Sequence, residues 1–160
     1  MAEKPVWKLL IEQLDTSSDL KAAVVIKRLK QIGEPAVADL IKASNDKKKP
    51  KIRKWAFEAL GEIAHPKAAK ILIKALTDEK MTIRLHALRG LIRMNHREAA
   101  GDVALLLKDE SGGIRQNALE ALEAFEAKEY AGRVAALADD PKPYIQKSAE
   151  RLLRMWKGKS

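Results

Sequence analysis

Apolar positions recur along this chain with a period of 31 residues. One column holds isoleucine in four successive units, and columns of alanine and leucine keep the same period. These columns are Ile52, Ile83, Ile114 and Ile145; Ala56, Ala87, Ala118 and Ala149; and Leu29, Leu60, Leu91, Leu122 and Leu153. Chance does not align so many apolar positions. The chain is therefore predicted to be a tandem array of similar units.

Each unit has the apolar spacing of two amphipathic helices. From Ile52 to Ile63 the apolar residues recur at every third or fourth position, and a second set with this spacing begins at Ala68, after Pro66. Gly33 is expected to end a helix. No segment alternates with period two, so no strand is expected. The pattern predicts an all-α fold.

The period divides the chain into five units of two helices each. Their predicted bounds are about 4–34, 35–65, 66–96, 97–127 and 128–158, within one domain over residues 1–160. The first unit is the most degenerate, because Lys21 stands where the isoleucine belongs.

Charged residues flank the isoleucine column in a fixed register. An aspartate precedes it by five residues at Asp78, Asp109 and Asp140, and the residue after it is Arg53, Arg84, Arg115 or Gln146. A helix, a turn with Asp, and a second helix with the motif Ile-Arg-x-x-Ala-x-x-x-Leu resemble the HEAT-like repeat. The form is the short 31-residue repeat first described in phycobilin lyases. The resemblance covers nearly the whole chain and implies a right-handed α-solenoid of five HEAT-like helix pairs.

In that family the Asp and Arg side chains form a hydrogen-bonded ladder between neighbouring repeats. The resemblance implies this role for Asp78, Asp109, Arg53, Arg84 and Arg115. Lys47, in the aspartate position of the second unit, and Gln146, in the arginine position of the fifth, are expected to interrupt the ladder.

Composition agrees with a helical array. Of the 160 residues, 46% are apolar and only 4% aromatic, and small apolar side chains let helices approach closely. No apolar stretch approaches the length of a membrane span, and the N-terminus lacks the order of a signal peptide, so a cytoplasmic protein is expected. The absence of cysteine excludes disulfides, thiolate catalysis and Cys-based metal sites.

The terminal units depart from the columns. Trp7 stands in a column of alanines and is expected to cover the open end of the array, while Glu150 and Gln146 replace an apolar residue and an arginine at the other end. The chain is therefore expected to be complete.

In the HEAT-like family, the helix that begins with Ile-Arg lines the concave face. At about 100° per residue, the most exposed column of this helix is Lys27, Glu58, Arg89, Glu120 and Arg151. Its charge alternates from one repeat to the next. The column is expected either to form lateral ion pairs or to present a mosaic of charges to a protein partner, and it is not the uniformly basic groove that a nucleic-acid duplex favours.

A second column runs beside it through Val24, Trp55, His86, Asn117 and Ser148. Trp55 is expected to be partly exposed, where it either anchors a partner or covers the seam between two helices. His86 is expected to be a surface or seam histidine. The predicted partner-binding residues are Trp55, Glu58, His86, Arg89, Arg93, Glu120 and Arg151.

The net charge of +9 resides mainly in the first three units, and the fourth unit carries −4 by residue count. The densest basic run covers residues 47–55 and holds the candidate nucleic-acid-binding residues Lys47, Lys48, Lys49, Lys51 and Lys54. These lysines could hold phosphates while Trp55 stacks on a base. A short lysine run in a turn is more often a solvated edge, and the glutamates of the fourth unit interrupt the basic track.

No catalytic constellation stands out in the sequence. His65 and His96 are one period apart, about one helix diameter, whereas two ligands of one metal must both come within about 2 Å of it. No nucleophile–base pair, Gly-rich phosphate loop or carboxylate dyad is present. The chain is predicted not to be an enzyme, and no catalytic residue, cofactor or metal is expected.

The sequence therefore predicts a protein-interaction module or assembly scaffold that binds a protein partner on its concave helix face. The alternative is a nucleic-acid-binding accessory protein that uses residues 47–55. A less favoured alternative is a bilin-lyase-like or chaperone-type subunit, because bilin lyases share this repeat but are longer and work as heterodimers. No membrane contact is expected, and the chain is expected to be a monomer or a weak homo-oligomer.

Overall fold

A computed structural model describes residues 3–158, which form ten α-helices joined by short turns and 3-10 segments, with no strand in that range. The helices are α1 (Val6–Gln13), α2 (Asp19–Ile32), α3 (Glu34–Asn45), α4 (Pro50–Ile63), α5 (Ala69–Ala75), α6 (Met81–Arg93), α7 (Ala100–Leu105), α8 (Gly112–Ala124), α9 (Ala131–Ala135) and α10 (Pro143–Gly158). The 3-10 segments are η1 (Pro66–Ala68), η2 (Arg97–Ala99), η3 (Leu106–Lys108), η4 (Lys128–Tyr130) and η5 (Ala136–Asp139). Consecutive helices pair along the array, which confirms the predicted all-α solenoid. In the described range no helix is long and apolar enough to cross a membrane.

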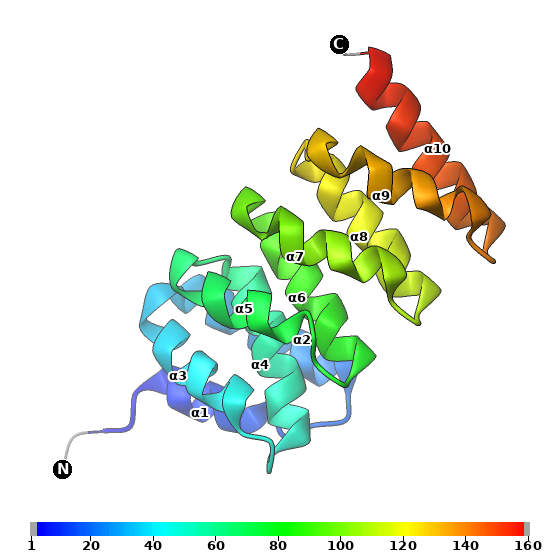
Figure 1. Cartoon of the computed structure of the whole chain (residues 1–160). Helices are drawn as coiled ribbons and strands as arrows, with labels where there is room; N and C mark the ends of the chain where they lie inside the picture. The colour runs from blue at the N-terminus through cyan, green and yellow to red at the C-terminus, as the bar shows by residue number, and fades with distance from the viewer. Residues whose placement is uncertain (1–2, 159–160) are drawn as a thin grey trace.

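The helices form two layers, and the two termini lie at opposite ends of the array (Figure 1). We call α1, α3, α5, α7 and α9 the outer layer, and α2, α4, α6, α8 and α10 the inner layer. Each inner helix packs against the next inner helix, whereas in the outer layer only α1 and α3 pack comparably. Closer spacing on one side bends a stack toward that side, so the inner layer is the concave one.

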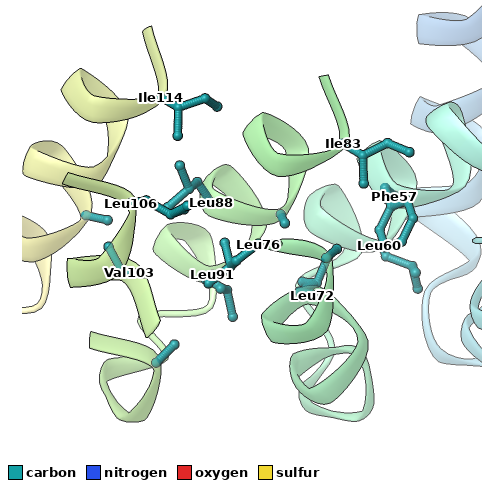
Figure 2. Close-up of a cluster of buried hydrophobic side chains, with 14 of the residues drawn as sticks. Phe57, Leu60, Leu72, Leu76, Ile83, Leu88, Leu91, Val103, Leu106 and Ile114 are labelled. Carbon is teal, nitrogen blue, oxygen red and sulfur yellow. The ribbon is translucent and has the colours of Figure 1, made fainter. Parts of the chain in front are cut away.

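Apolar side chains from both layers fill the space between them. Leu72 and Leu76 from the outer layer and Leu88 and Leu91 from the inner layer point into this space in Figure 2, and all four are fully or almost fully buried. The alanine column, from Ala56 to Ala149, is also buried and keeps the layers close.

A backbone feature repeats with the period of the array. Four residues directly after an inner helix or its last turn have positive φ: Gly33, Ala64, Asn95 and Glu126. A positive φ suits glycine, yet only the first of these junctions has one. The sequence analysis identified this junction at Gly33 alone; Asn95 also favours a positive φ, whereas Ala64 and Glu126 give no such signal.

The predicted Arg–Asp ladder is confirmed at three successive junctions, each linking residues 25 positions apart. Arg53 binds Asp78 through both terminal guanidinium nitrogens. Arg84 Nη2 donates to Asp109 Oδ1 at 3.0 Å, and Arg115 Nε donates to Asp140 Oδ2 at 2.7 Å. Each aspartate also accepts a backbone N–H from two residues further on, which holds the turn before the inner helix.

The ladder ends where the sequence predicted its interruptions. Gln146 Nε2 donates to the Asp140 carbonyl at 2.6 Å, as the arginines Arg84 and Arg115 do to Asp78 and Asp109, but makes no further link. In the second repeat Asp46 takes the turn-forming role beside Lys47, since its Oδ1 accepts from Lys48 N at 3.0 Å.

Trp7, the expected end cap, is bound to the second repeat. Its indole Nε1 donates to Asp39 Oδ2 of α3 at 2.9 Å, and the ring packs against the core. The hydrogen bond to Asp39 therefore links Trp7, in the first repeat, to the second repeat.

Candidate functional site

The inner layer carries the predicted charged column. Lys27, Arg89, Glu120 and Arg151 are exposed, and Glu58 is half-buried. Within residues 3–158, successive members of this column form no ion pair within 4.0 Å. The predicted row of lateral ion pairs in this register is therefore wrong.

The ion pairs between inner helices involve residues beside this column. Glu62 of α4 accepts from Lys30 Nζ of α2 at 3.0 Å and lies 2.6 Å from Arg93 Nη2 of α6. Arg151 of α10 forms a bidentate pair with Glu123 of α8, at 2.9 and 2.6 Å. Glu62 and Arg93 are one period apart, whereas Lys30–Glu62 and Glu123–Arg151 join positions 32 and 28 apart, so the pairs do not follow the most exposed column. Arg89 has no ion pair in the described part of the chain.

Trp55 is buried, with 6% of its surface exposed, which contradicts the expected half-exposed anchor. Its Nε1 donates to the carbonyl of Thr16 at 3.0 Å, and Lys54 Nζ lies 3.6 Å from its ring centroid. The connection between α1 and α2 and the Lys54 side chain therefore cover the ring. Trp55 fills the seam between the first and second repeats, which was the alternative role expected from the sequence.

His86 lies next to Trp55, with ring centroids 6.4 Å apart, and its side chain is 12% exposed. Its Nε2 is 3.8 Å from Glu58 Oε2. Burial, together with the charges of Lys54, Arg89 and Arg93, lowers the pKa of His86 to about 4, so the imidazole is neutral at pH 7. Burial also raises the pKa of Glu58, against the charge of Lys54.

The basic run at residues 47–55 is divided by the fold. Lys47, Lys48, Lys49 and Lys51 are exposed around the start of α4. Lys54 of α4 instead reaches toward α2, the preceding inner helix, where its Nζ is 3.9 Å from Asp19 Oδ1. The expectation that Trp55 stacks on a base is wrong, because its ring is covered.

The first repeat exposes an apolar pair that the sequence analysis missed. Leu20 is 79% exposed and Val24 is 55% exposed, one turn apart on α2. They line a hollow of about 560 Å³, whose other lining residues are Gln13, Asp15, Thr16, Lys21 and Val25. The available signal was that Leu20 and Val24 occupy columns that later repeats fill mostly with polar residues.

The two histidines one period apart lie in separate surroundings. His65 Nε2 is 3.8 Å from Glu34 Oε1, and His96 Nδ1 is 3.5 Å from Glu98 Oε2. Among residues 3–158, no three His, Asp or Glu side chains are arranged to hold a metal ion.

A profile of HEAT repeats matches residues 8–84 and 70–154, so the chain belongs to the HEAT-repeat family. No curated protein sequence matches it. Among solved structures, a chain in the complex of CpcE and CpcF of phycocyanin lyase from Nostoc sp. PCC7120 matches 92% of this chain and 97% of its own length, with a TM-score of 0.81 and 23% identity. A designed armadillo repeat protein in complex with peptide (KR)4 matches 92% of this chain and 80% of its own, with a TM-score of 0.62 and 16% identity.

At these identities the likeness to solved structures shows the fold alone. The match nevertheless extends over almost the whole length of the lyase chain. The expectation that lyases of this repeat type are longer therefore does not hold for that chain, and length is no argument against a lyase-type subunit.

Proposed function

We propose that this chain acts in the cytoplasm as a protein-interaction module or assembly scaffold, not as an enzyme, and that its inner layer binds a protein partner. The proposal rests on the division of polar groups in the array. The Arg–Asp ladder that joins the repeats is buried, whereas Lys27, Arg89 and Glu120 are exposed on one face. Charged side chains that do not hold the repeats together remain available for a partner.

The similar structures support the proposal. CpcE and CpcF form a complex with each other, and the designed armadillo repeat protein holds a peptide. A bilin-lyase-like or chaperone-type subunit that holds a chromoprotein would be a special case of partner binding.

Nucleic-acid binding remains the second candidate because Lys47, Lys48, Lys49 and Lys51 are exposed and close in sequence. No exposed aromatic ring accompanies them, since Trp55 is buried. Glu120 and Glu123 of α8 also interrupt a basic track along the inner layer. These features favour a protein partner.

The test is a comparison of captured proteins from nuclease-treated lysate. The double variant Lys27→Glu and Arg89→Glu reverses two exposed charges of the inner layer, and Lys70→Glu and Lys74→Glu makes the same charge change on exposed positions of α5. A partner of the inner layer should be lost from the first variant and kept by the second. Equal retention by both variants would refute inner-layer binding.

A separate measurement addresses nucleic acid. Wild type and a variant with Lys47, Lys48, Lys49 and Lys51 changed to Gln are titrated with a labelled single strand and duplex at physiological salt. Micromolar or tighter binding with a steep salt slope, lost in the variant, would replace our proposal with the second candidate.

A further inference from the structure

The inner layer is electrostatically divided. Outside the ladder, α2, α4 and α6 together carry eight basic side chains and three acidic ones. Helix α8 carries Glu120 and Glu123 and no basic side chain outside the ladder. A ligand that lies across the first three inner helices therefore meets an excess of basic side chains, including the exposed Lys27 and Arg89, and one that continues over α8 meets the exposed Glu120.

The positive surface is centred on the seam between α4 and α6. Lys54 covers the Trp55 ring, which borders His86, and Arg89 is exposed on the same helix as His86. The cations Lys54, Arg89 and Arg93 face this histidine, with Glu58 as the acidic neighbour at 3.8 Å. Burial is the largest cause of the low pKa of His86, and the three cations lower it further.

The apolar hollow beside α2 adjoins this surface through two contacts. Thr16, which lines the hollow, accepts the hydrogen bond of Trp55 Nε1. Asp19, next to Leu20, lies 3.9 Å from Lys54 Nζ. An apolar site and a basic site thus lie next to each other on α2, α4 and α6.

We propose that the partner segment bound by the inner layer is an acidic polypeptide with an apolar side chain. The apolar side chain occupies the hollow at Leu20 and Val24, and the carboxylates face Lys54 and Arg89. This inference rests on the proposed function and names the chemistry of the partner. A protein segment fits better than a nucleic acid because every aromatic ring on α2, α4 and α6 is buried or nearly so, which leaves no surface for base stacking.

The experiment is a fluorescence-anisotropy titration of the full chain with a short labelled peptide that combines glutamates with leucines. A second peptide has glutamine at each glutamate, and a single-stranded oligonucleotide of equal charge serves as competitor. Arg89→Gln tests the basic site, and Arg154→Gln is its matched control, an exposed inner-layer arginine on α10. Leu20→Ser tests the hollow, and Leu105→Ser is its control, a leucine with 59% exposure on α7.

We expect the glutamate peptide to bind and the glutamine peptide to bind at least about fivefold more weakly. Arg89→Gln and Leu20→Ser should each weaken binding about fivefold, while both controls should retain it. All four positions are exposed, so the variants should fold, which circular dichroism checks. The His86 ring pKa, followed by NMR, should rise when the peptide is bound, because carboxylates offset the nearby cations.

Equal binding of the two peptides, or no saturable binding of either, would overturn the inference. So would an Arg89→Gln variant that matches Arg154→Gln. If the captured partner is still lost from the Lys27→Glu and Arg89→Glu variant, the proposed function survives and only the acidic class of partner fails. Displacement of the peptide by a far lower concentration of oligonucleotide would assign the basic surface to nucleic acid.

Discussion

Gly61 of α4 and Gly90 of α6 bring the backbones of two inner helices into contact. A Cβ atom on Gly90 would lie 2.9 Å from the Gly61 Cα and 2.9 Å from Leu72 Cδ1, and a Cβ on Gly61 would lie 3.0 Å from the Gly90 Cα. Helices α4 and α6 can approach this closely only because neither position has a side chain. The crossing fixes the spacing between Trp55 on α4 and His86 on α6.

Gly90→Ala should therefore destabilise the protein, although alanine favours helix formation. We expect a loss of about 1–3 kcal/mol from overpacking against Gly61 and Leu72. Gly132→Ala in α9 is the control, because no atom lies within 4 Å of its added Cβ, and it should gain up to about 1 kcal/mol. Urea titrations of both variants check the opposite signs; a Gly90→Ala variant as stable as wild type would contradict the close crossing.

Asp109→Ala should be strongly destabilising because it removes the buried carboxylate of the almost fully buried Arg84 guanidinium and leaves only the exposed Glu110, 3.5 Å from Arg84 Nη2. The expected loss is about 3–5 kcal/mol. Asp46→Ala removes the same kind of turn hydrogen bond but no ladder partner, so its loss should be about 0.5–1.5 kcal/mol. Thermal unfolding of the Asp109→Ala and Asp46→Ala variants compares the loss of a ladder partner with the loss of a turn hydrogen bond alone. Similar losses of stability would show that the ladder contributes little.

Ala64→Gly should stabilise the protein, since Ala64 is left-handed with φ 53° and ψ 36°. Relief of the left-handed conformation outweighs the entropy of glycine by about 1 kcal/mol. The same substitution at Ala23, an exposed position inside α2, should lower stability by about 1 kcal/mol. Differential scanning calorimetry of the two variants would reveal a shift of the melting temperature in opposite directions; a drop in both would argue against this junction.

Trp55→Ala should reduce stability by about 3–5 kcal/mol, as expected for a large buried ring. Leu91→Ala, fully buried in a central repeat, should cost about 2–5 kcal/mol. Trp7→Ala should cost less than either, because the Trp7 ring is only partly buried. Denaturant titrations rank the three variants; a Trp55→Ala protein of wild-type stability would restore the interpretation of Trp55 as an exposed anchor.

Acid should weaken the fold through His86. Its pKa is about 4 when folded and about 6.5 when unfolded, so folding disfavours its protonation. The resulting stability is fully present above about pH 6.5 and is lost as the pH falls toward 4, by up to about 3 kcal/mol. His86→Asn removes the titrating ring and introduces the residue type that Asn117 has at the equivalent position of the next repeat. This variant should lose this part of the pH dependence. The free energy of unfolding measured across this range checks the effect, and an unchanged slope in the variant would refute it.

Contacts within each repeat and between adjacent repeats explain why the fold could be predicted from the sequence. Each repeat packs on the repeats beside it, so the columns Ile52 to Ile145 and Leu29 to Leu122 mark buried positions in successive units. The same reasoning applies to the ladder, because each arginine, such as Arg84, binds the aspartate of the next repeat, such as Asp109, 25 positions further on. A periodic chain thus encodes both its layers and its repeat junctions.

The candidate site depended on contacts that the period does not encode. Thr16 covers Trp55 from 39 positions away, and Val24 is 55% exposed although Trp55, one repeat later in the same column, is buried. Ion pairs such as Glu123 and Arg151 follow the reach of individual side chains, because these residues are 28 positions apart and stand in different columns. Periodicity determines which face of a helix is buried, but exposure and pairing at its edges depend on what packs there, and this only the tertiary structure decides.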